Sequence, residues 1–272
     1  MLDFFQYDFL TKALVGGLLL AFSCGILSPW VVAKRYAFMS EGIAHSTLLS
    51  FALTLSLVSL ENTFSFYTLY VVISLFLVFI LATFTYLERL PSDTLMGLFL
   101  SGTLSLGLLF HFLYGKGQMD LSSFLFGNIL FIENIDITFL LILSLLCFLI
   151  FYYGWKKWLY LTFDPEGAKI SGIKDSFYHY AFFLLLGILI LSAIKFCGTL
   201  LTNTLLIFPG AFALKLARSM KQAIFISVLF SLITLTLGLF LSNFYEIPPG
   251  AGLTLTQLFF FSLTFFKKRS FL

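Results

Sequence analysis

Apolar runs long enough to cross a membrane dominate the chain, and short polar turns separate them. A helix needs about 17–25 residues to span the hydrocarbon core of a bilayer. Nine runs fit or come close to this length: Leu10–Ala33, Ala37–Leu60, Phe64–Leu87, Thr94–Tyr114, Ile135–Tyr153, Phe177–Ile194, Gly198–Leu216, Ala223–Phe244 and Gly250–Phe266. The pattern predicts an all-α polytopic membrane protein, a bundle of about 8–9 transmembrane helices in one domain over residues 1–272.

One further apolar run lies between the fourth and fifth predicted spans. Leu121–Ile132 is too short to cross a bilayer. We expect a segment at about residues 119–132 to lie at the membrane interface or to re-enter the bilayer from one side.

The composition agrees with this assignment. Hydrophobic residues make up 60% of the chain and charged residues only 11%, which excludes a soluble domain. A net charge of +3 gives no support to nucleic-acid binding, because basic residues in a membrane protein report topology first. Cys24, Cys147 and Cys197 lie in separate apolar runs. Neither a disulfide framework nor a thiolate metal cluster is therefore indicated.

The basic residues predict the orientation of the chain, because cytoplasmic loops accumulate Lys and Arg. Strict alternation of nine spans leaves only Lys12, Lys116 and Lys195 outside. The other basic residues fall inside: Lys34, Arg35, Arg89, Lys156, Lys157, Lys169, Lys174, Lys215, Arg218, Lys221, Lys267, Lys268 and Arg269. This bias predicts an outside N-terminus and a cytoplasmic C-terminus.

Glu41 and His45 are the most informative polar residues of the chain. They lie four residues apart in the second predicted span, so both side chains leave the same helical face. A carboxylate in a membrane is costly and usually faces a bundle interior or an ion path, and carboxylate plus imidazole suits divalent metal ions. The alternative is a glutamate that extends to the nearby cytoplasmic interface.

Small residues recur at intervals of four in two predicted spans, and such rows allow close helix packing. The two rows are Gly17, Ala21 and Gly25, and Gly97, Ser101 and Ser105.

Pro209 and Gly210 interrupt the seventh predicted span. Proline in a helix interior removes one hydrogen bond and clashes with the preceding turn, so we expect a kink or an unwound turn there. With Asn203 earlier in the same span, this region either lines a pathway or is a structural kink.

The loop from Lys156 to Ser176 contains a helix signal. Asp164 is a good N-cap, Pro165 suits the first helical position, and Glu166 places an acid in the first turn. Gly172 is a plausible stop. Taken alone, such a short helix docks on a partner or merely connects two spans.

Catalytic motifs are absent from the sequence. It has no phosphate-binding loop, no nucleophile elbow and no His-Glu-x-x-His motif. We therefore expect a transport subunit and not an enzyme, with no permanently bound cofactor.

Several blocks together resemble the ABC-3 family, the permease subunits of ATP-binding-cassette transporters for zinc, manganese or iron. The resemblance covers nearly the full length, and its blocks are Ser40–Ser46, Phe124–Leu130, Phe163–Glu166, Gly198–Leu201, Leu206–Ala211 and Pro248–Gly250. The family usually has Asp where this chain has Glu41 and Asn128. A charged role at Asn128 is therefore not carried over.

The resemblance implies the ABC importer permease fold in a bacterial inner membrane. Two permeases, identical or different, would form the pore, two separate ATPase subunits would drive it, and a solute-binding protein would deliver Zn²⁺ or Mn²⁺, or Fe²⁺, from outside. It also implies that Glu41 and His45 are the metal site in the pathway. A coupling helix at about residues 163–174 would contact the ATPase through Phe163, Asp164, Pro165, Glu166 and Gly167.

Two other transport classes and one enzyme class fit these residues less well. A secondary metal transporter usually shows inverted repeats with several intramembrane acids, and neither is evident. A permease for a siderophore or cobalamin should lack a metal-ligating pair. A membrane enzyme lacks its catalytic constellation here.

Overall fold

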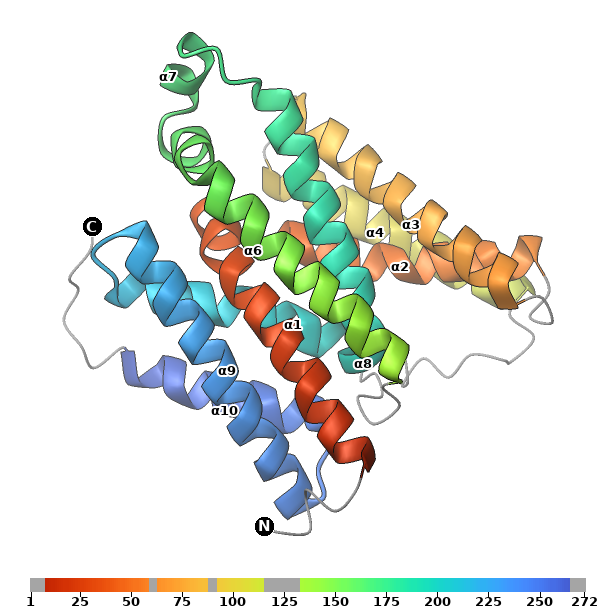
Figure 1. Cartoon of the computed structure of the whole chain (residues 1–272). Coiled ribbons are helices and arrows are strands. Elements are labelled where there is room, and N and C mark those ends of the chain that lie inside the picture. The colour runs from red at the N-terminus through yellow and green to blue at the C-terminus, as the bar shows by residue number, and fades with distance from the viewer. Residues whose placement is uncertain (1–7, 59–62, 88–91, 115–132, 265–272) are drawn as a thin grey trace.

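A computed structural model describes residues 8–58, 63–87, 92–114 and 133–264. Every element in this part of the chain is helical. The elements, named as in Figure 1, are α1 (Asp8–Ala33), α2 (Ala37–Leu57), α3 (Thr63–Tyr86), α4 (Ser92–Tyr114), α6 (Asn134–Phe163), α7 (Pro165–Ile170), α8 (Asp175–Leu216), α9 (Met220–Tyr245) and α10 (Pro249–Leu263). The all-α prediction is confirmed. The expected segment at about residues 119–132 lies outside the described residues.

Helix α1 lies at the centre of the bundle and contacts α6, α8 and α9 (Figure 1). Helix α2 packs on α4, α8 and α3, and α10 packs on α9 and α8. Trp30 of α1 stacks on Phe151 of α6, with ring centroids 5.6 Å apart. The bundle thus consists of an α2–α3–α4 group and an α1–α6–α9–α10 group, both in contact with α8.

Among the described helices, six are long and apolar enough to cross a membrane, and they include α1, α3, α4, α6 and α9. The sixth is the Asp175–Ile194 part of α8. Helix α2 has the length of a span but not the hydropathy, and α10 has only 15 residues. Outward-facing apolar side chains such as Phe76, Phe112 and Ile142 present a surface suited to lipid.

Helix α8 consists of two helical segments that meet at Gly198. Gly198 has φ 70° and ψ 175° and alone interrupts the helical backbone of α8. The sixth and seventh predicted spans therefore belong to one broken helix. The expectation of an unwound turn at Pro209 and Gly210 is wrong, because the backbone there remains helical.

The residue after Pro209 is bonded to a neighbouring helix. The Gly210 N–H donates a hydrogen bond of 2.6 Å to the Ser28 hydroxyl of α1. A freed backbone donor in hydrocarbon must find such a partner. A Cβ on Gly210 would lie 2.5 Å from the carbonyl carbon of Ser28. Helices α1 and α8 consequently meet backbone to backbone at this point.

The two rows of small residues have different surroundings. A Cβ on Gly25 would lie 2.7 Å from Cα of Val228 in α9, and the Ser231 hydroxyl donates to the Ala21 carbonyl at 2.7 Å. Close packing is confirmed at these positions. Among the described residues no neighbour packs on the row of α4, where a Cβ on Gly97 meets nothing within 4 Å and Ser101 and Ser105 are exposed, so close packing there stays a prediction.

We predict that Gly210→Val destabilises the protein by at least about 1–3 kcal/mol, because the added side chain collides with backbone atoms of α1. Thermal unfolding of the purified protein in detergent measures the change. Gly97→Val is the matched control and should change the melting temperature much less, since its Cβ meets open space. Equal effects of both variants would contradict the close approach of α1 and α8.

Candidate functional site

Helix α2 is buried in the bundle despite its many polar residues. Its hydroxyls bond to its own backbone carbonyls: Ser46 to Ile43, Thr47 to Ala44, Ser50 to Ser46 and Thr54 to Ser50. A hydroxyl paired in this way can be buried at little cost. The helix thus sits among α3, α4 and α8 without an exposed apolar face of its own.

One stripe of α2 differs from the rest of the helix. Phe38 is 64% exposed, and the side chains of Glu41 and His45 are 42% and 18% exposed. The intervening Gly42, Ile43 and Ala44 are buried. A Cβ on Gly42 would collide with the Met96 side chain of α4. Tight packing on α4 therefore orients Glu41 and His45 toward an uncovered side.

Glu41 and His45 lie side by side as the sequence predicts. The Nε2 atom of His45 is 4.0 Å from Oε1 of Glu41. Two ligand atoms on a tetrahedral zinc ion, each about 2.0–2.2 Å from the metal, lie about 3.4 Å apart. The observed separation is close to this value. A small side-chain rotation would bring both atoms onto one ion.

This pair supplies only half of a tetrahedral set. Within the described ranges, no group of three or more His, Cys, Asp and Glu side chains is arranged to hold a metal ion. His179 of α8 is engaged elsewhere, with Nε2 2.9 Å from the Ala82 carbonyl oxygen of α3. The described residues thus bring no third such side chain to an ion at Glu41 and His45.

Helix α7 begins where the sequence predicts. The Asp164 carboxylate accepts a hydrogen bond of 2.9 Å from the Gly167 N–H, and Pro165 is the first helical residue. A Cβ on Gly167 would collide with this carboxylate. The helix ends just before Gly172, whose φ of 75° favours glycine.

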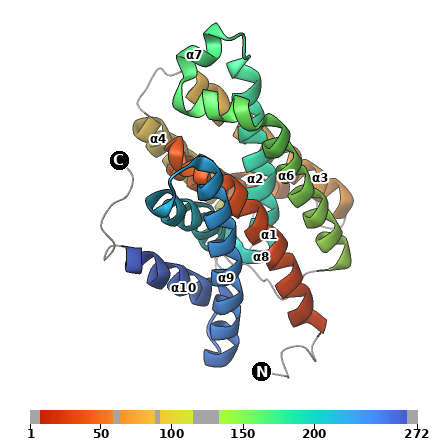
Figure 2. The ribbon, with the colours of Figure 1, turned by 60° about the vertical axis from the view of Figure 1, so that its left-hand side comes forward.

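Helix α7 projects beyond the ends of α6 and α8, at one end of the molecule (Figure 2). Ala168 is buried against the bundle, whereas Phe163 and Glu166 are exposed and Ile170 is 89% exposed. Exposed side chains therefore lie at both ends of this region: Phe163 at the end of α6, and Glu166 and Ile170 on α7.

The residues predicted to form a pathway kink, Asn203, Pro209 and Gly210, have different surroundings in the structure. Pro209 and Gly210 are buried, and Gly210 lies against Ser28 of α1. Asn203 is half-buried, and its Oδ1 has no hydrogen-bond partner among the described residues. The break at Gly198 lies where the sequence separates the sixth predicted span, which ends at Ile194, from the seventh, which begins at Gly198.

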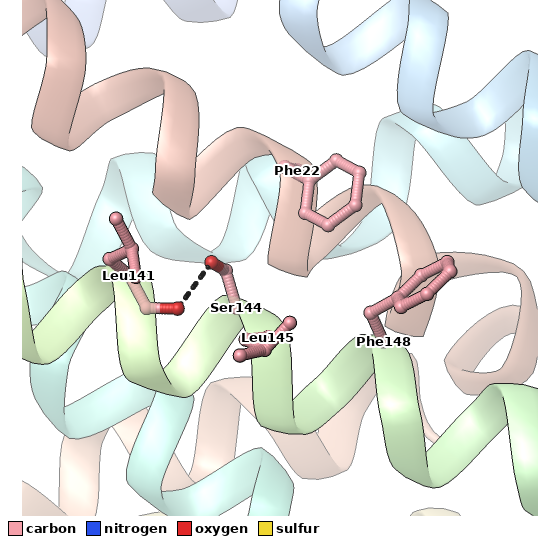
Figure 3. Close-up of a pocket in the computed structure, with 5 residues that line it drawn as sticks. All are labelled: Phe22, Leu141, Ser144, Leu145 and Phe148. Carbon is pink, nitrogen blue, oxygen red and sulfur yellow. Dashed lines mark hydrogen bonds between the residues drawn. The ribbon is translucent and has the colours of Figure 1, made fainter.

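A cavity of about 260 Å³ lies between α1 and α6, away from the polar residues of α2. Figure 3 shows its lining of Phe22, Leu141, Ser144, Leu145 and Phe148, with the Ser144 hydroxyl bonded to the Leu141 carbonyl at 2.8 Å. No charged group lines it. Its chemistry is apolar and offers nothing to a metal ion.

Known proteins resemble this chain over nearly its whole length. The high-affinity zinc uptake system membrane protein ZnuB of Buchnera aphidicola (subsp. Schizaphis graminum) is 31% identical, covering 97% of this chain and 99% of the relative. The manganese import system permease protein ScaB of Streptococcus gordonii is 28% identical, with 96% and 92% covered.

The fold also has a solved counterpart. A chain in the structure of PsaBC from Streptococcus pneumoniae in complex with Fab is 29% identical and superposes with a TM-score of 0.82, covering 98% of this chain and 94% of that one. Residues 6–268 match the ABC 3 transport family. Sequence and fold therefore agree, and this chain belongs to the ABC 3 transport family.

Proposed function

We propose that this chain is the membrane-spanning permease subunit of an ATP-driven importer of a divalent transition metal ion: zinc, manganese or iron. The observation that carries the proposal is the Glu41–His45 pair on a partly exposed stripe of α2. Relatives named for zinc uptake and manganese import support it. A bare ion needs such ligands in its path, whereas a large chelate does not.

The metal site is completed by a second permease, identical or related. A two-fold axis beside the exposed stripe would bring together two carboxylates and two imidazoles. Monodentate carboxylates would give zinc its tetrahedral shell, and bidentate carboxylates with water would suit manganese or iron. A shared site also binds transiently, because separating the two halves releases the ion.

Helix α7 docks on a separate ATPase subunit. The exposed Phe163 and Ile170 supply apolar contact, and the Asp164 cap with Gly167 keeps the short helix folded before it meets its partner. ATP is hydrolysed in that partner, since the sequence has no phosphate-binding loop of its own.

The permease lies in a bacterial inner membrane with its N-terminus outside and its C-terminus in the cytoplasm, as the basic residues favour. An extracytoplasmic metal-binding protein delivers the ion to the outer face. Asn203, with its unbonded Oδ1, belongs to the pathway wall, and Pro209 with Gly210 holds the second segment of α8 against α1.

We predict that Glu41→Gln and His45→Gln each lower ATP-dependent metal uptake at least about tenfold, because each removes a ligand. Uptake of radioactive zinc and manganese into vesicles that hold the permease, its ATPase and its binding protein measures this loss. Glu41→Asp keeps an oxygen ligand and should retain most of the uptake.

The control is His111→Gln, which changes a histidine of α4 outside the pair. Assembly with the ATPase is checked in every variant by co-purification. Wild-type uptake in both Glu41→Gln and His45→Gln, with assembly intact, would contradict a metal path along α2.

We predict that Asp164→Ala weakens binding of the ATPase subunit, because the loss of an N-cap destabilises α7 by about 1 kcal/mol. Hydrogen exchange of the amides of residues 165–170 should become faster, and less ATPase should co-purify. Ser219→Ala removes the cap of α9, where the Ser219 hydroxyl accepts from the Gln222 N–H, and should leave ATPase binding unchanged. Equal losses from both variants would argue against docking through α7.

A further inference from the structure

The first turn of α8 carries a carboxylate that lies between two cationic segments. Oδ2 of Asp175 is 4.0 Å from Nζ of Lys169 on α7. The same carboxylate acts electrostatically on Lys34, in the turn between α1 and α2. The Asp175 side chain is 26% exposed and that of Lys169 is 64% exposed, so the carboxylate is partly shielded from water while the ammonium group of Lys169 is not.

Lys34 is held in an aromatic recess. Its Nζ lies 5.9 Å from the ring centroids of both Tyr36 and Phe182, within the range of cation–π attraction. Burial lowers the pKa of Lys34, and the Asp175 carboxylate opposes part of this effect. The Phe182 ring and the Asp175 carboxylate, both on α8, therefore attract the ammonium group of Lys34.

Tyr36 attaches the start of α2 to the same helix. Its ring contacts His179, Phe182 and Phe183 of α8, with centroids 6.4, 6.0 and 5.4 Å away. Its carbonyl accepts hydrogen bonds from Met39 and Ser40 at 3.0 and 3.1 Å. The residue that precedes α2 therefore also packs its side chain on α8.

The turn between α1 and α2 is short and has little freedom. Arg35 has φ 58°, an unusual value for a residue with a side chain, and the Tyr36 N–H donates to the Val31 carbonyl at 2.8 Å. Glu41 follows Tyr36 by five residues, about 7 Å along the helix axis. A shift of this turn therefore displaces Glu41.

We propose that Asp175 is a positioning residue that couples α7 to the Glu41–His45 pair, by binding Lys169 of α7 on one side and attracting Lys34 of the α1–α2 turn on the other. The inference rests on the proposed function, since α7 is the docking helix and the pair is the metal site. When the ATPase displaces α7, Asp175 and the first turn of α8 move with it. Lys34 and Tyr36 pass the displacement to α2.

The test uses the whole transporter, with permease, ATPase and binding protein, in vesicles. Asp175→Asn keeps the size of the side chain and removes its charge. ATPase binding and basal ATP hydrolysis should persist, whereas the amount of zinc or manganese moved per ATP hydrolysed should fall at least about fivefold, the lower end of usual coupling between sites. Asp175→Glu restores the charge and should restore most of the ratio.

The matched control is Asp136→Asn. Asp136 also lies in the first turn of a long helix, α6, so both variants lose the same favourable interaction with a helix N-terminus. Asp136 lies at the end of α6 that is remote from α7. An equal loss of transport per ATP in Asp136→Asn and Asp175→Asn would overturn the proposal.

A second readout does not depend on metal transport. A fluorophore attached through Phe38→Cys, in a chain whose native cysteines are replaced by alanine, reports movement of α2 beside the pair. ATP binding should change its emission in the otherwise unaltered chain and much less in Asp175→Asn. A response that persists in Asp175→Asn, or that is absent from both, overturns the coupling role.

These two readouts separate failure of the coupling role from failure of the metal-import function. If Glu41→Gln leaves uptake unchanged but the fluorophore signal depends on Asp175, the metal site is wrong and the coupling role stands. If uptake depends on Glu41 but the fluorophore signal is the same in Asp175→Asn, the metal site stands and the coupling role is wrong.

Discussion

The absence of water in a bilayer governs this structure, because every polar group within the hydrocarbon must find its partner inside the protein. The buried hydroxyls of α2 meet the requirement locally, through carbonyls one turn earlier. Gly210 meets it at long range, through Ser28 of α1. Glu41 and His45 stand apart, since their side chains are neither fully buried nor bonded to the backbone. That departure supports the proposal that they bind the transported ion.

Properties set by neighbouring residues were predictable from the sequence. Helix positions followed from the lengths of the apolar runs, and the start of α7 followed from Asp164 and Pro165, whose effects are local. The break in α8 falls between the sixth and seventh predicted spans, so its place was predictable. The contact beside Pro209 was not, because the Gly210 N–H bonds to Ser28, 182 residues away in the sequence. The surroundings of the small-residue row on α4 were likewise not predictable, since the spacing of small residues does not reveal whether another helix packs on them.

The pair on α2 followed from the sequence because helical spacing places both side chains on one face. Its exposure did not, since that depends on how α3, α4 and α8 cover the other faces. A site with two ligands per chain is weak alone and strong only when two chains meet. In the proposed shared site, affinity for the ion would vary with the distance between the two chains, which is the property that a transporter must change during each cycle.

The modest hydropathy of α2 has a consequence for how the protein is made. A helix with this many hydroxyls, a carboxylate and an imidazole partitions poorly into lipid by itself, and α2 is not among the helices apolar enough to span a membrane unaided. The tight turn at Arg35 joins it directly to α1, the most buried of the membrane-spanning candidates. The two are therefore expected to leave the translocation machinery as a hairpin, and α2 to stay shielded until α4 is synthesised.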